Sequence, residues 1–125
     1  MKKIKHENHS LLIAIDSRME SESQIIREKK VLLDERVAAL LDVSITVIQR
    51  KVRDNQDRFP KIFMFQLTQK ETKKIFGQVT KRRKIYAFTW GGVILLAGLI
   101  NTQKAIDIHL QIIRFYGNGI LNKIF

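Results

Sequence analysis

The chain has 125 residues, a net charge of +11 at pH 7 and no cysteine. The lack of cysteine excludes disulfide bonds, thiolate zinc sites and a cysteine nucleophile. The apolar content of 45% favours one packed domain over a disordered chain. Residues 49–84 contain 12 basic and 3 acidic side chains, whereas residues 1–48 contain 8 of each. Such a localised positive field indicates a polyanionic partner, either nucleic acid or an anionic membrane.

The sequence of the first third of the chain predicts a polar arm followed by a β-hairpin. Residues 1–23 are polar and aperiodic, which favours an arm or a short helix. Their apolar run, Leu11 to Ile15, is too short for a secretion signal, so we expect a cytoplasmic protein associated with the bacterial nucleoid. In residues 24–33 two apolar ends flank a charged centre at 27–30. This pattern predicts a β-hairpin, although without the glycine that a tight turn prefers.

Two short helices with a three-residue break between them are expected next. Asp34 can cap the first and Ser44 the second, on either side of the break at Asp42-Val43-Ser44. The second helix places an apolar stripe inward and polar residues outward: the stripe is Ile45, Ile48 and Val52, and the outward residues are Thr46, Gln49, Arg50 and Arg53. A helix, a short turn and a second helix with a polar outer face predict a helix-turn-helix, in which the second helix is the recognition helix.

Strands and helices alternate in the second half of the chain. Residues 62–67 and 85–88 predict two paired strands, and the capping box from Thr68 to Glu71 opens a short helix between them. The basic run 81–84 predicts an exposed loop. Two helices should then follow, over about 89–100 and 102–116.

Residues 85–100 carry no charge, which raises the question of a membrane helix. Their strand-like start and the Gly91-Gly92 pair favour a buried core instead, since a spanning helix needs about 20 apolar residues. The expected fold class is therefore α+β: a helix-turn-helix-containing helical domain with a small antiparallel sheet. We divide the chain into an arm (1–23), a domain (24–116) and a tail (117–125).

Several ordered blocks across residues 24–116 resemble a known family. They are Lys30-Val-Leu-Leu-Asp34, the helix and turn from Val37 to Val43, Val52 with Asn55, Arg58-Phe59-Pro60, Phe63-Met-Phe-Gln-Leu-Thr68, Tyr86-Ala-Phe-Thr89, Gly92-Val93, and the helix from Ala105 to Phe115. In these blocks the chain is similar to the phage open-reading-frame-six N-terminal DNA-binding domain, a relative of the KilA-N domains of antirepressors. It departs from that pattern where Glu28-Lys29 and Asp42 replace usual glycines. The resemblance implies sequence-specific binding of double-stranded DNA by a phage or prophage transcription regulator.

Candidate DNA contacts are of two kinds. Gln49 suits adenine, and Arg50 and Arg53 suit guanine, because their forked side chains match those base edges. Hydroxyls and backbone amides at a helix start bind phosphate, and exposed cations do the same. The predicted contact residues are Ser44, Thr46, Gln49, Arg50, Arg53, Asn55, Lys81, Arg82, Arg83 and Lys84.

Other function classes have less support. No carboxylate pair, nucleophile motif or metal-ligand spacing is present, so we expect no enzyme, no cofactor and no metal. The alternative is a protein-interaction module, an antirepressor that binds a phage repressor through its C-terminal helix and apolar tail. The same surface could form a homodimer, which would suit paired DNA half-sites. Peripheral membrane binding is a distant third because that helix has few cations, and a membrane is not among the expected partners.

Overall fold

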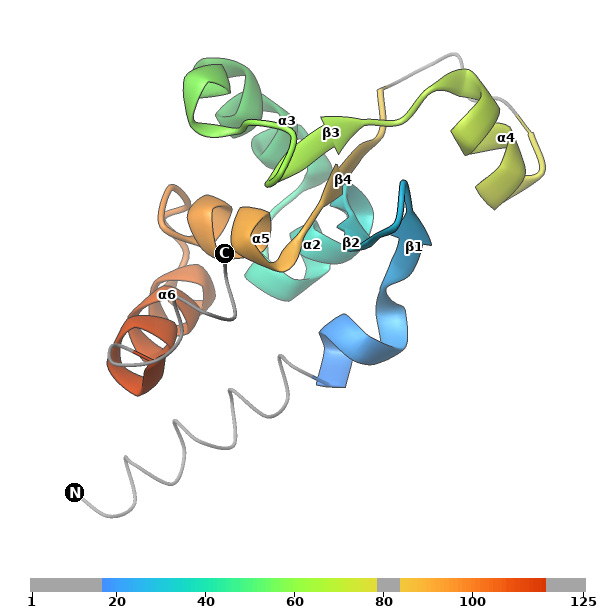
Figure 1. Ribbon diagram of the computed structural model, residues 1–125. Coiled ribbons are helices and arrows are strands. Elements are labelled where there is room, and N and C mark those ends of the chain that lie inside the picture. The colour runs from blue at the N-terminus through green and yellow to red at the C-terminus, as the bar shows by residue number, and fades with distance from the viewer. Residues whose placement is uncertain (1–16, 79–83, 117–125) are drawn as a thin grey trace.

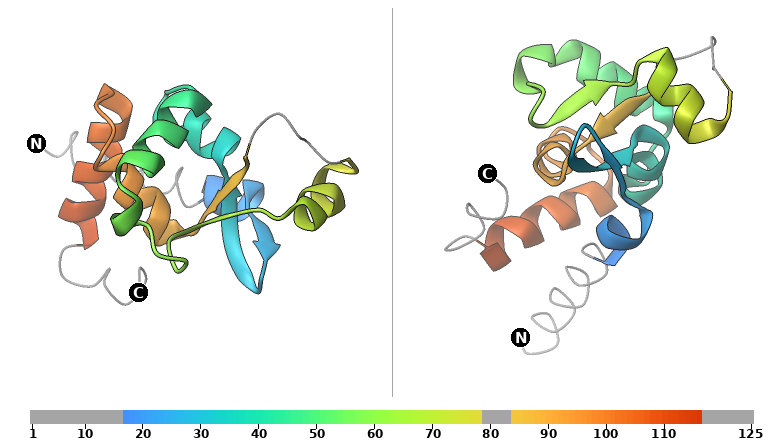
Figure 2. Two further views of the ribbon diagram at one scale, coloured as in Figure 1. Left: turned by 90° about the horizontal axis from the view of Figure 1, so that it is seen from above. Right: turned by 45° about the vertical axis from the view of Figure 1, so that its right-hand side comes forward.

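The computed structural model describes residues 17–78 and 84–116, where helices pack around a small twisted sheet (Figures 1 and 2). Residues 17–22 are helical. The elements that follow are β1 (Gln24–Ile26), β2 (Lys29–Leu33), α2 (Asp34–Leu41), α3 (Ile45–Asp54), the 3-10 helix η1 (Gln56–Arg58), β3 (Met64–Gln66), α4 (Gln69–Phe76), β4 (Tyr86–Phe88), α5 (Trp90–Ala97) and α6 (Gln103–Tyr116). The α+β prediction is confirmed.

All four strands belong to one antiparallel sheet with the order β1-β2-β4-β3. Phe65 pairs with Ala87, which confirms the expected pairing of the two later strands, and Leu32 pairs with Phe88. The strand predicted at 62–67 is shorter than expected at its start. The amides of Phe63 and Met64 both donate to the carbonyl oxygen of Pro60, at 2.8 and 3.1 Å, so a turn occupies residues 60–63.

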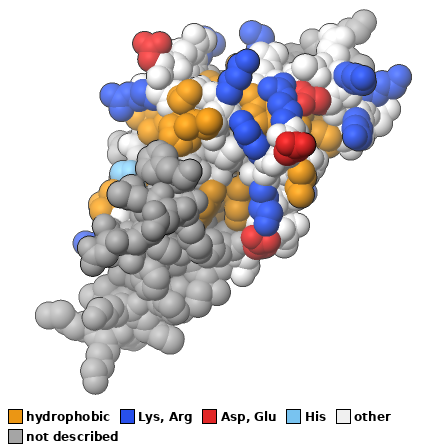
Figure 3. Space-filling view, viewed as in Figure 1, with side chains coloured by type: hydrophobic (Ala, Val, Ile, Leu, Met, Phe, Trp, Pro, Cys, Tyr) orange, Lys and Arg blue, Asp and Glu red, His pale blue; other side chains and the backbone are white. Residues whose placement is uncertain are grey.

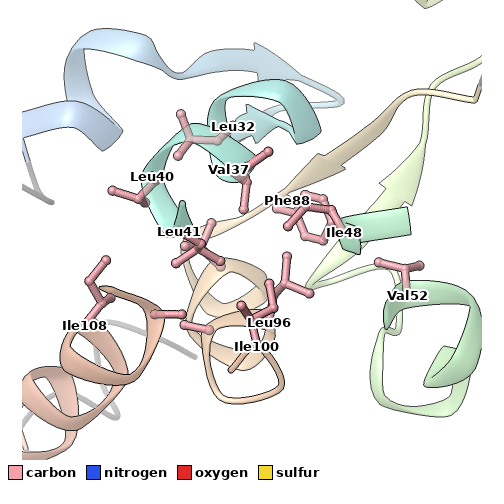
Figure 4. Close-up of a cluster of buried hydrophobic side chains, with 14 of the residues drawn as sticks. Leu32, Val37, Leu40, Leu41, Ile48, Val52, Phe88, Leu96, Ile100 and Ile108 are labelled. Atoms are coloured by element: carbon pink, nitrogen blue, oxygen red, sulfur yellow. The ribbon is translucent and has the colours of Figure 1, made fainter. Parts of the chain in front are cut away.

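The sheet separates two hydrophobic clusters, because successive side chains of a strand point to opposite faces. On one face, Leu32 and Phe88 join the larger cluster, which α2, α3, α5 and α6 complete (Figure 4). On the other face lies a smaller cluster against which Ile75 of α4 packs; its buried members are Ile26, Val31, Leu33, Phe65, Leu67, Ile85 and Ala87.

The β1–β2 hairpin forms without glycine, as predicted. Its two turn residues, Arg27 and Glu28, have φ angles of 55° and 63°. A two-residue turn with both central φ values positive matches the right-handed twist of the strands, but non-glycine residues adopt it at a steric cost. Arg27 compensates through contacts with α4 that are described below, whereas the Glu28 side chain is exposed.

Substitution of Glu28 by glycine should therefore stabilise the protein. Removal of the Cβ at this left-handed position relieves a cost of about 1 kcal/mol, and the exposed side chain contributes little to packing. We expect Glu28→Gly to raise the free energy of unfolding, measured by urea denaturation, by roughly that amount. Arg27→Gly is the matched control and should give no such gain. Lower stability of Glu28→Gly would contradict the turn geometry.

The start of α6 is fixed to α2 by one side chain. Thr102 Oγ1 donates to the carbonyl oxygen of Leu41 at 2.7 Å and accepts from the amide of Ala105 at 3.2 Å. One face of α6 is thereby buried in the larger cluster, where Ile108 is fully inaccessible. Within residues 17–78 and 84–116, no helix has the length and apolar content needed to cross a bilayer.

Candidate nucleic-acid interface

Helix α3 has one buried and one exposed face. Its N-cap is Ser44, whose hydroxyl oxygen accepts from the amide of Val47 at 3.3 Å, as predicted. Ile48 and Val52 are 0% and 2% exposed and pack in the larger cluster. The opposite face is accessible and carries Thr46, Arg50 and Arg53. The amphipathic pattern of the sequence thus predicted the orientation of α3 correctly.

The break between α2 and α3 depends on a left-handed residue. Asp42 is the C-cap of α2 with φ 59°, and its amide donates to the carbonyl oxygen of Ala38. The amide of Val43 donates to the same oxygen at 3.0 Å. Helices commonly end on a left-handed residue, which is usually glycine. This explains why glycine is usual at this position in the family that the chain resembles. Aspartate is tolerated because its short polar side chain visits this region more readily than most.

Asp34 does not cap α2, contrary to the prediction. The N-cap is Leu33, which makes no side-chain cap, and Asp34 is the first helical residue and fully buried. Its Oδ2 accepts from the amide of Tyr86 on β4 at 3.1 Å and from Gln49 Nε2 at 3.4 Å. A local sequence pattern cannot reveal these contacts, because the partners lie 52 and 15 residues away. Asp34 instead connects α2, α3 and β4.

Two of the predicted contact residues on α3 bind within the protein. Gln49 Nε2 also donates to the carbonyl oxygen of Lys84 at 2.7 Å, so the side-chain amide predicted to contact adenine is already hydrogen-bonded. Asn55, the C-cap of α3, donates from Nδ2 to the carbonyl oxygen of Lys51 at 2.8 Å. The exposed Lys84 lies beside α3 through the same contact with Gln49. Lys81, Arg82 and Arg83 lie outside the described residues.

The two arginines of α3 are accessible for an outside partner. The guanidinium of Arg53 lies 4.0 Å from Asp54, and both side chains are mostly exposed, at 70% and 61%. An exposed pair of this kind contributes little to stability and is screened by salt. Among the described residues, the ion pairs do not include Arg50.

A second basic element, α4, was not among the predicted contacts. Its capping box is formed as expected, with Thr68 accepting from the amide of Glu71, and Gly77 ends the helix at φ 77°. Lys70, Lys73 and Lys74 are all exposed. Lys73 and Lys74 follow Lys70 by three and four residues, in a helix that contains one acid. This spacing is visible in the sequence and predicts that the lysines are neighbours on one face of the helix.

The single acid of α4 is neutralised inside the molecule. Arg27 donates from both Nε and a terminal nitrogen to the carboxylate of Glu71, each at 3.0 Å. The same guanidinium donates to the carbonyl oxygen of Gln66 at 3.3 Å and lies 4.2 Å from the ring centroid of Phe65. Hydrogen bonds from Arg27, and then from the backbone amide of Thr68, lower the pKa of Glu71 from 4.5 to about 2.

This pKa gives a pH-dependent contribution to stability. Since the folded-state pKa is the lower one, the contribution is present above about pH 4.5 and disappears as the pH falls towards 2. Glu71→Gln retains a capping-box residue but removes the charge. We expect it to lower the free energy of unfolding by about 0.5 to 1 kcal/mol at neutral pH, and the difference to shrink below pH 4.5. Urea denaturation across pH tests this, with Glu20→Gln as the control for an exposed pair. A difference independent of pH would be the contrary result.

The described residues contain no group of three or more histidine or acidic side chains arranged to hold a metal ion. The exposed side chains described above offer positive charge and hydrogen bonds: arginines and a threonine on α3, and lysines on α4 and at residue 84. The space-filling view shows Lys and Arg side chains over the upper part of the molecule, with few acids between them (Figure 3).

The chain was compared with protein families, curated proteins and solved structures. The model of the ORF6N domain matches residues 22–99, a range that contains all elements from β1 to α5. No curated protein and no solved structure matches the chain. The family match covers more than half of the 125 residues. The chain therefore belongs to the ORF6N domain family.

Proposed function

We propose that this protein binds double-stranded DNA sequence-specifically, with α3 as the recognition helix, and acts as a phage or prophage transcription regulator. One observation carries the proposal: α3 presents Arg50, Arg53 and Thr46 to solvent while its opposite face is fixed in the core. Helix α2, the three-residue turn and α3 have the order of a helix-turn-helix, in which the second helix enters the major groove. Membership of the ORF6N domain family is compatible with a regulatory role.

The side chains of α3 and its surroundings divide into two roles. Arg50 and Arg53 are the base readers, because a guanidinium makes bidentate contacts with guanine. Ser44 and Thr46 lie where helix amides and hydroxyls bind a phosphate, and Lys84 supplies a cation beside them. Gln49 can read adenine only after its bonds to Asp34 and Lys84 break, so we assign it to the support of α3.

Selection from a labelled duplex library at several salt concentrations, followed by sequencing of the bound fraction, tests the proposal. With about four to six neutralised phosphates, log affinity should fall against log salt with a slope near −0.9 per phosphate. A recovered motif together with a steep slope would support the proposal. Weak binding without sequence preference and with a flat salt response would exclude it.

A second candidate is a protein-interaction module that binds a repressor. It is favoured by one observation: Leu110 and Ile113 on α6 are 44% and 52% exposed, although both are large and apolar. The same pair could instead join two copies of this chain. Leu110→Ser with Ile113→Ser should abolish binding to a phage repressor, or dissociate a dimer seen by sedimentation. If the variant kept both its binding to the repressor and its mass in sedimentation, this surface of α6 would be excluded as an interface.

A further inference from the structure

We propose that α4 is a second DNA-contacting element, which binds backbone phosphates of the same duplex that α3 reads. This inference rests on the proposed function and extends it to a surface outside the helix-turn-helix. Its ligand is the phosphate backbone of double-stranded DNA, because α4 offers lysine ammonium groups, which are point charges without the fork that base recognition requires.

The first support is the charge that α4 presents. Lys70, Lys73 and Lys74 are exposed within eight residues, and Glu71 is the only acid. Because Arg27 binds that carboxylate on both oxygens, no acid of α4 remains free to compensate the lysines. The three lysines therefore leave α4 with a net positive charge, which a solvated helix with balanced charges would not have.

The second support is the way in which α4 is attached. It contributes only Thr72 as a buried residue, with Ile75 packed at the edge of the smaller cluster. Figure 1 shows α4 beyond the end of β3 and β4, away from α2, α5 and α6. A helix with so small a buried face adds little to the core, yet Arg27 occupies a left-handed position to hold it. Arg27 is thus a positioning residue: it orients α4 and does not itself contact DNA.

The third support is the distance between the two elements. Gln78 follows α4, and the backbone of Lys84 is hydrogen-bonded to Gln49 on α3. Five residues lie between these two points, which makes six steps along the chain, so their separation is at most about 22 Å. One turn of B-DNA spans about 34 to 36 Å. A duplex is therefore long enough to contact α3 and α4 together, and both helices lie on the upper side of the molecule in Figure 1 and in the right view of Figure 2.

The test is the salt dependence of DNA binding by the triple variant Lys70→Gln, Lys73→Gln, Lys74→Gln. We expect its affinity to fall about 10-fold or more at 100 mM salt, and the slope of log affinity against log salt to lose roughly 0.9 for each phosphate contact removed. The preferred sequence should not change, because phosphate contacts weaken binding to all sequences equally. Arg36→Gln, Lys104→Gln, Arg114→Gln removes the same charge from exposed sites on α2 and α6, and it should retain most of the slope.

The outcomes separate this inference from the proposed function. If the unaltered protein binds DNA with sequence preference and the α4 variant keeps its slope and affinity, α4 is not a contact and only this inference fails. If both triple variants show the same decrease in salt dependence, the decrease comes from the overall charge of the protein and not from α4, and the inference also fails. If the unaltered protein does not bind DNA, the proposed function fails first. Circular dichroism and thermal unfolding of the variants establish that all are folded.

Discussion

Gly92→Ala should cost more than about 3 kcal/mol of the free energy of unfolding, a large share of the 5 to 15 kcal/mol typical of a domain. A Cβ at this position of α5 would lie 1.9 Å from the carbonyl oxygen of Phe63 and 2.8 Å from its carbonyl carbon. Both are backbone atoms, so no side-chain rotation can relieve the overlap. The same oxygen accepts from the amide and hydroxyl of Thr89, at 3.0 and 3.3 Å, which prevents an independent shift.

Urea denaturation at neutral pH measures this loss, and Gly77→Ala is the matched control. Gly77 has φ 77°, but nothing lies within 4 Å of the Cβ that alanine would add. Its substitution should therefore cost only the left-handed strain, about 1 to 2 kcal/mol. Equal costs at the two glycines would contradict the close approach of α5 to Phe63.

Arg50→Ala with Arg53→Ala should weaken binding to the preferred DNA site at least about 30-fold and broaden the recovered motif. Each bidentate arginine–guanine contact provides about 1 to 3 kcal/mol of discrimination. Since Arg50 is exposed and the pair of Arg53 with Asp54 is solvated, the substitutions should leave stability within about 0.5 kcal/mol. Competition binding with matched and shuffled duplexes measures both quantities.

The control for this pair is Lys104→Ala with Arg114→Ala, which removes two exposed cations of α6. It should reduce affinity for all duplexes slightly and equally. If the α3 variant retained its preferred site, α3 would not be the recognition helix. The α4 lysine variant should differ from the α3 variant by keeping its sequence preference, and from the α6 control by a larger loss of affinity.

The sequence allowed prediction of those features that depend on neighbouring residues. The hairpin at 24–33, the two caps at Ser44 and Thr68, and the inward stripe of α3 all follow from local pattern, and all are formed. The pairing of β3 with β4 was also predicted, because two apolar runs flank one capped helix.

Features that depend on distant contacts could not be predicted. The role of Asp34 arises from Tyr86 and Gln49, and Arg27 is held at its left-handed position by Glu71, 44 residues away. Likewise, Gly92 gave no signal that it faces the backbone of Phe63. Periodicity correctly predicted that Thr46, Arg50 and Arg53 are exposed. It could not show that Gln49, also predicted to face outward, is hydrogen-bonded to Asp34 and to the backbone of Lys84.

The unequal clusters on the two faces of the sheet divide the molecule into parts of different local stability. Within the described residues the larger cluster has 17 buried members and the smaller has 7. Segments with fewer apolar contacts open at lower free energy than the rest, often as one cooperative unit. Amide hydrogens of β1 and α4 should therefore exchange through sub-global opening, and those of α2 and α5 only through complete unfolding. In the proposed DNA complex, the part that carries α4 can therefore adjust to the duplex while the part that carries α3 remains rigid.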